Sequence, residues 1–165
     1  MQLDELTTEV LAFRAGFGTV VMATADATGH PEASYAPYVT DDDGRFFVFL
    51  SALASHTHQI EHSGVASLLF VEDECKAREA FARRRLTVAC VAKFVARDAD
   101  TWPSVLDRFA ARFGAVVGVL RALPDFRLFM LEPRAATYVR GFGQAYRLAV
   151  PGLEVLAPLG AGRPG

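Results

Sequence analysis

Hydroxyl and imidazole side chains gather where a predicted strand passes into a predicted helix. Ser51 ends an apolar run, and Ser55, His56 and Thr57 follow it closely. The first turn of a helix offers free backbone N–H groups and the positive end of the helix dipole, which together bind anions. These residues could therefore form a phosphate cradle. In the alternative interpretation Ser51 is only the N-cap of a helix over residues 52–62.

Three consecutive arginines, Arg83, Arg84 and Arg85, precede a long apolar strand. A guanidinium group can hold a phosphate or carboxylate through two parallel hydrogen bonds. Because side chains alternate along a strand, one or two of the arginines would face each side of it. They either reach a ligand cleft or form a solvated strand end that protects a sheet edge.

The segment Ser34-Tyr35-Ala36-Pro37 is a strand of mostly small residues that ends in proline. Proline has no N–H group and cannot continue a ladder on that side, so backbone polar groups would be left for a ligand. The alternative is an ordinary edge strand.

Three of the four histidines lie in the helix predicted over residues 52–62. His58 and His62 are four positions apart and share a face, whereas His56 points away from them. A zinc site needs further ligands on that face, and neither Cys75 nor Cys90 lies nearby in the sequence. We expect solvated histidines and no metal site.

The elements that must position these groups are short strands joined by tight turns. Apolar runs predict strands over residues 19–24, 32–39, 45–50, 65–71, 86–95, 126–131 and 136–146. Helical spacing and capping residues predict helices over residues 3–14, 52–62, 100–112 and 115–123. Gly141 and Gly143 interrupt the last strand and indicate a bulge or a close backbone approach. We expect an α+β, mainly β fold: a closed or half-closed barrel of six to seven mostly antiparallel strands with three to four flanking helices.

Composition narrows the class of protein further. The 165 residues are 52% hydrophobic, which excludes a mainly disordered chain. A net charge of -2 gives no basic field for nucleic acid, and no apolar run is long enough to span a membrane. With two cysteines that form no motif, we expect a reduced, cytoplasmic protein. We expect residues 1–150 to form one domain and residues 151–165 to form a Pro- and Gly-rich tail with a mobile end. The many apolar strand residues indicate a dimer.

Five segments carry a family likeness when they are taken together and in order. They are Thr19-Val-Val-Met-Ala-Thr-Ala-Asp, Pro31-Glu-Ala-Ser-Tyr-Ala-Pro-Tyr, Ala66-Ser-Leu-Leu-Phe-Val-Glu-Asp-Glu, Phe81-Ala-Arg-Arg-Arg-Leu-Thr and Gly141-Phe-Gly-Gln-Ala-Tyr. Over about residues 5–150 the chain resembles the haem-utilisation branch of the pyridoxamine 5'-phosphate oxidase-like, FMN-binding split-barrel superfamily. The resemblance implies a split-barrel homodimer with small-molecule sites at its interface, where some members bind FMN and others bind haem.

For FMN, the resemblance implies phosphate contacts and a strand along the flavin ring. The phosphate contacts would be Ser51, Ser55, His56, Thr57 and Arg85, with Arg84 adjacent, and the ring would lie along Ser34, Tyr35, Ala36 and Pro37. The oxidases carry Ser-Arg-Lys where this chain has Ser55-His56-Thr57, and arginine where it has Ser34. Each missing charged contact is worth about 1.5–3 kcal/mol, so oxidation of pyridoxamine phosphate is not expected. The first hypothesis is an FMN-dependent oxidoreductase whose substrate and catalytic residues are unassigned.

For haem, Thr19 and Asp125 match family positions associated with the haem site. The family's axial histidine lies in a C-terminal Gly-His-Arg stretch, where this chain reads Gly162-Arg163-Pro164. Arginine stays protonated and offers no lone pair to iron, so His56, His58 or His62 would have to replace it. A haem-binding protein is the second hypothesis, and a split barrel that binds neither ligand is the third.

Overall fold

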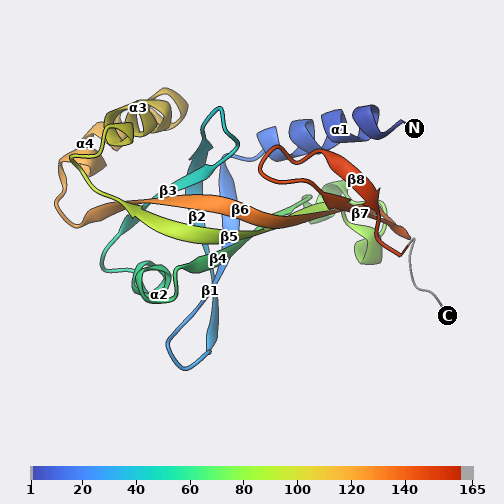
Figure 1. Cartoon of the computed structure of the whole chain (residues 1–165), viewed down its shortest axis with the longest axis horizontal. Helices are drawn as coiled ribbons and strands as arrows, with labels where there is room; N and C mark the ends of the chain where they lie inside the picture. The colour runs from blue at the N-terminus through green and yellow to red at the C-terminus, as the bar shows by residue number, and fades with distance from the viewer. Residues whose placement is uncertain (1, 161–165) are drawn as a thin grey trace.

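A computed structural model describes residues 2–160 as one antiparallel sheet that curls into a barrel (Figure 1). The eight strands run in the order β3-β2-β1-β4-β5-β6-β7-β8, and β3 also pairs with β6, which closes the first six into a barrel. The strands are β1 Thr19–Ala25, β2 Pro31–Thr40, β3 Phe46–Ser51, β4 Val65–Val71, β5 Arg85–Val95, β6 Phe126–Gly141, β7 Gln144–Leu148 and β8 Val155–Pro158. The mainly β split barrel expected from the sequence is confirmed, with eight strands instead of six to seven.

Four α-helices flank the barrel: α1 Leu3–Ala15, α2 Ser55–Ser63, α3 Thr101–Phe113 and α4 Val116–Ala122. Figure 1 places α3 and α4 beside β3, α1 beside β7 and β8, and α2 below the barrel near β1. Two short 3-10 turns, η1 Glu74–Lys76 and η2 Ala80–Ala82, lie in the loop between β4 and β5. The predicted four helices are confirmed.

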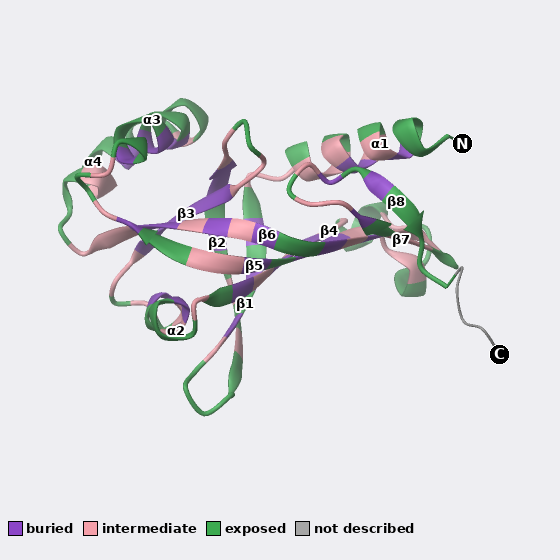
Figure 2. Cartoon of the chain, viewed as in Figure 1, coloured by how far each residue is buried: buried purple, intermediate pink, exposed green. Residues whose placement is uncertain are grey.

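Two hydrophobic clusters meet at β3, which is buried on both faces. Its residues Phe46, Val48 and Leu50 point into the barrel, whereas Phe47 and Phe49 belong to a second cluster formed with α3 and α4. Alternation along a strand places these two sets on opposite faces. Figure 2 shows the buried side of α3 turned toward the sheet. The continuous apolar run of β3 is thus explained by burial on both sides.

The start of α2 differs from the prediction, and Ser51 is not its N-cap. The helix begins at Ser55 with Ala54 as N-cap, because β3 continues through Ser51. The Ser51 hydroxyl instead accepts the N–H of Leu53 at 3.2 Å. The sequence prediction places the start of the helix about one turn too early, because Ser51 is the last residue of β3.

The two late strands predicted over residues 126–131 and 136–146 are one long strand followed by a hairpin. β6 runs unbroken from Phe126 to Gly141, with a register shift where it passes Ala89 and Cys90 of β5. The expected bulge at Gly141 is confirmed by a second register shift between Val139 and Gly141. The chain then turns through Gly143, whose φ of 69° favours glycine.

The Pro- and Gly-rich segment after residue 150 packs against the barrel as far as residue 160. Leu153 and Val155 are 0% and 6% exposed and join the barrel core, and β8 pairs with β7. The predicted mobile end falls on residues 161–165, which lie outside the described residues.

Candidate functional site

The residues predicted to bind a phosphate lie at two opposite ends of β1. At one end, the Thr24 hydroxyl donates to Gln59 of α2. At the other end, Arg85 pairs with Val71, which lies level with Thr19 at the start of β1. Strand spacing puts these ends about 17 Å apart. A single chain therefore does not bring the start of α2 and the arginines into one pocket.

The hydroxyls at the start of α2 already have partners within the protein. Ser55 donates to the Glu32 carboxylate, which also accepts Gln59 Nε2 at 2.8 Å. Thr57 is fully buried and donates to the Ser51 carbonyl at 2.6 Å. Burial lowers the pKa of His56, which keeps its imidazole neutral at pH 7, although nearby Glu32 acts in the opposite direction. With a carboxylate beside the first turn, this helix start is poorly suited to an anion.

The segment Ser34–Pro37 lies inside a strand that continues to Thr40. Pro37 does not end the strand: β2 goes on to pair with β3 from Tyr38 onward, in agreement with the strand predicted over residues 32–39. Tyr35 is 68% exposed on one face of the sheet, whereas Ala36 points into the barrel core. Ser34 Oγ is the one buried side-chain polar atom without a hydrogen-bond partner among residues 2–160.

The three arginines have different partners. Arg83 Nε donates to the Glu72 carbonyl at 3.0 Å, and Arg84 Nε donates to the Glu72 carboxylate at 2.9 Å. Arg84 also lies 5.4 Å from the ring centroid of Phe13 in α1. Arg85 donates only to the Arg83 carbonyl, at 3.1 Å, and no carboxylate of residues 2–160 forms an ion pair with it. Two of the three arginines thus have a structural role, whereas the Arg85 side chain contacts only a backbone carbonyl.

One face of the barrel sheet is apolar and uncovered in the single chain; we call it the outer face. Across it, Val21 pairs with Tyr35 and Leu69, and the next row holds Ala23, Ala33, Ser67 and Ala89. Val21, Tyr35 and Val65 are 38%, 68% and 52% exposed. The outer face is therefore a flat surface of small and apolar side chains.

A groove of about 530 Å³ crosses the lower part of the outer face, and we call it the sheet groove. Its lining consists of Ala23, Thr24, Ala25, Val65, Ala66, Ser67, Ala89, Cys90, Val91 and Arg134. Burial raises the pKa of Cys90 to about 12, so its thiol stays protonated at pH 7. Arg134 is the one charged group among these lining residues. The volume of the sheet groove is typical of a small-molecule site.

Arg134 reaches the outer face because of the irregularity in β6. Ala89 pairs with Ala135 and Cys90 with Pro133, so Arg134 is the extra residue of the bulge. Sequence reasoning missed it, although the polar stretch over residues 132–135, between two apolar runs, was an available signal.

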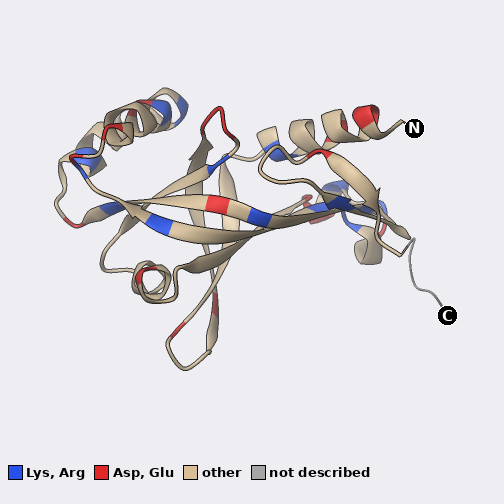
Figure 3. Cartoon of the chain, in the orientation of Figure 1, with Lys and Arg blue, Asp and Glu red and all other residues tan. Residues whose placement is uncertain are grey.

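A second groove of about 630 Å³ lies between α1, the loop after β4 and the β6–β7 hairpin. Opposite charges pair with one another in its wall: Arg140 Nε lies 2.9 Å from Glu9, and the Tyr138 hydroxyl donates to Glu9 at 2.8 Å. Figure 3 likewise shows lysine, arginine and acidic residues interspersed over the whole fold. These pairs attach α1 to the barrel.

The positions linked to haem by the family resemblance are separate in one chain. Thr19 is exposed and pairs with Pro37. The Asp125 carboxylate accepts a hydrogen bond from Ser51 Oγ at 3.5 Å. Ser51 is the last residue of β3, on the side of the barrel where α2 begins. Within residues 2–160 no group of three or more His, Cys, Asp or Glu side chains is arranged to hold a metal ion.

Among residues 2–160 none of the helices is both long enough and apolar enough to cross a bilayer.

The chain is similar to known proteins in both sequence and fold. The sequence profile of the pyridoxamine 5'-phosphate oxidase family matches residues 6–140. The haem oxygenase HutZ of Vibrio cholerae serotype O1 is 41% identical over 144 residues, which cover 87% of this chain and 81% of HutZ. These matches confirm the family resemblance drawn from the sequence motifs.

Solved structures agree with the sequence matches. The crystal structure of HutZ, described as a haem storage protein, superposes with a TM-score of 0.74 at 40% identity, covering 81% of this chain and 92% of that one. Campylobacter jejuni ChuZ superposes with a TM-score of 0.84 at 28% identity, covering 100% of this chain and 67% of that one.

The expectation of an FMN-dependent oxidoreductase is wrong. The relative at 41% identity is named a haem oxygenase, and its crystal structure is described as that of a haem storage protein. The local chemistry agrees with this correction, since His56 and Thr57 replace two cations and Glu32 adds a carboxylate at the helix start. These relatives favour the haem alternative instead.

Proposed function

This chain belongs to the pyridoxamine 5'-phosphate oxidase family, and within that family we propose that it binds haem and takes part in haem utilisation. One observation carries the proposal: the 41% identity with a haem oxygenase over 87% of this chain. Identity of that extent spreads over the barrel and its loops, so it reaches beyond the fold alone.

The outer face has the chemistry that haem requires. A porphyrin needs a flat apolar surface, and the rows of alanine, valine and serine on the outer face provide one, with Tyr35 exposed beside them. Its carboxylates need cations, and Arg85 and Arg134 stand at the two ends of this face. The residues present therefore fit the group.

The iron ligand is more restricted. The whole sequence holds four histidines, at positions 30, 56, 58 and 62, so a histidine ligand from this chain must be one of them. His30 already contacts Thr28 and Asp26 within its turn. The three histidines of α2 are the better candidates, and neutral His56 keeps a lone pair for a metal.

Bound haem would supply the iron chemistry of oxygen binding and electron transfer. The chain's own part is to shield one face of the ring from water, to orient it through the carboxylates and to hold the imidazole neutral.

A second copy of the chain completes the site in this proposal. The outer face exposes Val21, Tyr35 and Val65 side by side, and exposed apolar patches of this kind often mark a dimer interface. A partner would also bring its own α2 to the outer face, which one chain cannot do because α2 lies below the barrel. The ligand would then lie between two protomers.

Titration of the purified protein with haemin, followed by desalting and a visible spectrum, tests the proposed function. We expect a Soret band that stays with the protein at a fixed haem-to-chain ratio. Retention of FMN bands with no Soret band would refute the proposal. A reductant added under air then separates the two named activities of the relative, since degradation bleaches the Soret band and storage preserves it.

A further inference from the structure

The groove of about 630 Å³ beside the β6–β7 hairpin, which we call the hairpin groove, is separate from the outer face. Arg84 lines the hairpin groove, whereas Arg85 stands at one end of the outer face. Adjacent residues of an extended chain point to opposite sides of a sheet, so these two arginines mark two different surfaces. A ligand in the hairpin groove would therefore leave the outer face free.

Four cations line the hairpin groove, and three of them already have carboxylate partners. The paired cations are Arg84, Arg140 and Lys76, which lie 2.9 Å, 2.9 Å and 3.0 Å from the carboxylates of Glu72, Glu9 and Asp73, respectively. The fourth is Arg78, which is exposed and forms neither an ion pair nor a side-chain hydrogen bond within residues 2–160. Arg78 is thus the cation that the folded chain leaves available at this groove.

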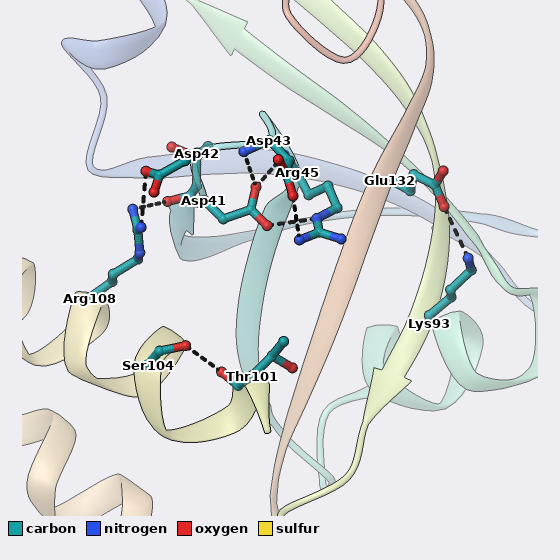
Figure 4. A network of polar contacts seen from close by, with 10 residues as sticks. Asp41, Asp42, Asp43, Arg45, Lys93, Thr101, Ser104, Arg108 and Glu132 are labelled. Atoms are coloured by element: carbon teal, nitrogen blue, oxygen red, sulfur yellow. Dashed lines mark hydrogen bonds and ion pairs between the residues drawn. The ribbon is translucent and has the colours of Figure 1, made fainter. Parts of the chain in front are cut away.

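Most lysines and arginines among residues 2–160 contact a carboxylate, and Arg78 departs from that arrangement. Figure 4 shows the common case in three cations that each lie beside a carboxylate, namely Arg45, Arg108 and Lys93. Arg78 has Glu79 next to it in the sequence, but the Glu79 carboxylate accepts the Phe81 N–H at 3.4 Å and caps η2. The Arg78 guanidinium therefore keeps its five N–H donors for another molecule.

An exposed aromatic ring stands at the rim of the same groove. Phe142 lies at the tip of the β6–β7 hairpin, lines the hairpin groove and is 84% exposed. The face of a phenyl ring packs well against a second aromatic ring, in an offset or edge-to-face arrangement. Phe142 and Arg78 together offer a surface for a ring and a partner for an anion.

The charge of the lining favours a ligand with one negative charge. Against the four cations stand three carboxylates, those of Glu9, Glu72 and Glu79, which leaves one positive charge. One guanidinium binds one planar carboxylate through two parallel hydrogen bonds. A phosphate dianion would need a second unpaired cation, and the other three cations of the lining are held in ion pairs.

From this geometry we infer that the hairpin groove binds an aromatic monocarboxylate, whose carboxylate is held by Arg78 and whose ring packs against Phe142. The inference goes beyond the proposed function, because it assigns a second site on another side of the sheet to another class of ligand.

An NMR titration of the ¹⁵N-labelled full chain with benzoate tests the inference. Benzoate should shift the amide signals of Gly141, Gly143 and Gln144, which lie on either side of Phe142. Benzyl alcohol keeps the ring without the carboxylate, and acetate keeps the carboxylate without the ring. Each should bind at least about tenfold more weakly than benzoate, since each lacks one of the two contacts.

Variants assign the two contacts to their residues. Arg78→Ala should weaken benzoate binding about tenfold or more, and Arg78→Lys should restore part of the loss. Phe142→Ala should also weaken it, because the ring then lies against solvent. Arg147→Ala is the matched control and should bind benzoate like the wild type. Arg147 is likewise exposed and forms no ion pair within residues 2–160, but it lies on β7 and is absent from the groove lining.

Several outcomes would overturn the inference. Equal benzoate affinity in the wild type and Arg78→Ala would remove Arg78 from the site, and amide shifts confined to other segments would place the ligand elsewhere. Tighter binding of inorganic phosphate than of benzoate would contradict the assignment to a carboxylate.

Haemin titration of the same variants keeps the two sites apart. Arg78→Ala and Phe142→Ala should bind haemin like the wild type, and a parallel loss of haemin and benzoate binding would overturn the second site. A wild type that binds benzoate but no haemin would instead refute only the proposed function.

Discussion

Neighbouring residues of one type have different roles in this protein. Arg84 and Arg85 are adjacent in the sequence, yet Arg84 contacts a carboxylate and an aromatic ring whereas Arg85 contacts only a carbonyl. Alternation along β5 separates them to opposite faces, a division that the sequence did predict. Which of the two stays free depends on Glu72, and no local pattern shows that Glu72 would lie beside them.

Replacement of each arginine by alanine should separate these roles. Arg84→Ala leaves the largely buried Glu72 carboxylate without its ion pair, so we expect a loss of about 1–2 kcal/mol in the free energy of unfolding. Arg85→Ala should change the free energy of unfolding by less than about 0.5 kcal/mol. Urea unfolding followed by the fluorescence of Trp102 measures both. A larger loss in Arg85→Ala would contradict the assignment.

Strands and helices were predicted well where burial follows a simple period. β4 has the predicted bounds, α1 ends one residue later than predicted, and α3 is shifted by one residue at both ends. Prediction failed where tertiary contacts override local signals. Ser51 extends β3 because that strand pairs with β6 as far as Phe126, a contact between residues far apart in the sequence.

The candidate site was predicted less completely than the fold. Residue types made candidates of Arg85 and of Ser55, His56 and Thr57, but their separation along β1 depends on strand order, which spacing does not encode. The bulge at Arg134 was missed because two apolar runs with a polar gap were interpreted as two strands. The register of β5 against β6 decides that question, and register is a property of the assembled sheet.

The segment over residues 151–158, which ends in β8, shows how a Pro- and Gly-rich stretch can still be part of the core. Leu153 is 0% exposed with φ of 64°, and its N–H donates to the Ala149 carbonyl at 2.9 Å. Leu153→Ala removes a fully buried side chain and should lower the free energy of unfolding by about 2–5 kcal/mol. Leu156→Ala is the matched control in the same segment, since Leu156 is 54% exposed. Equal stability of the two variants would show that the segment is not part of the core in solution.

At the scale of the whole molecule, the outer face is the feature that a single chain leaves unresolved. Small side chains make it flat, and the described helices lie elsewhere: α3 and α4 beside β3, α1 beside β8 and α2 below the barrel. The two cationic ends, the sheet groove and Thr19 all open onto it. A face of this composition is expected to bury itself against another surface, and the proposed second copy offers an identical one.

A charge placed at the centre of the outer face should therefore separate the protomers. Val21→Arg puts a guanidinium beside Tyr35 and Leu69, where a dimer would have to bury it unpaired. Val119→Arg is the control, because Val119 is also exposed, at 65%, but lies on α4. Sedimentation velocity should show a dimer for the wild type and Val119→Arg and a monomer for Val21→Arg. Haem affinity should fall together with dimerisation, since the ring would lose the apolar surface on its second side. A monomeric wild type that binds haem with full affinity would instead place the whole site within one chain.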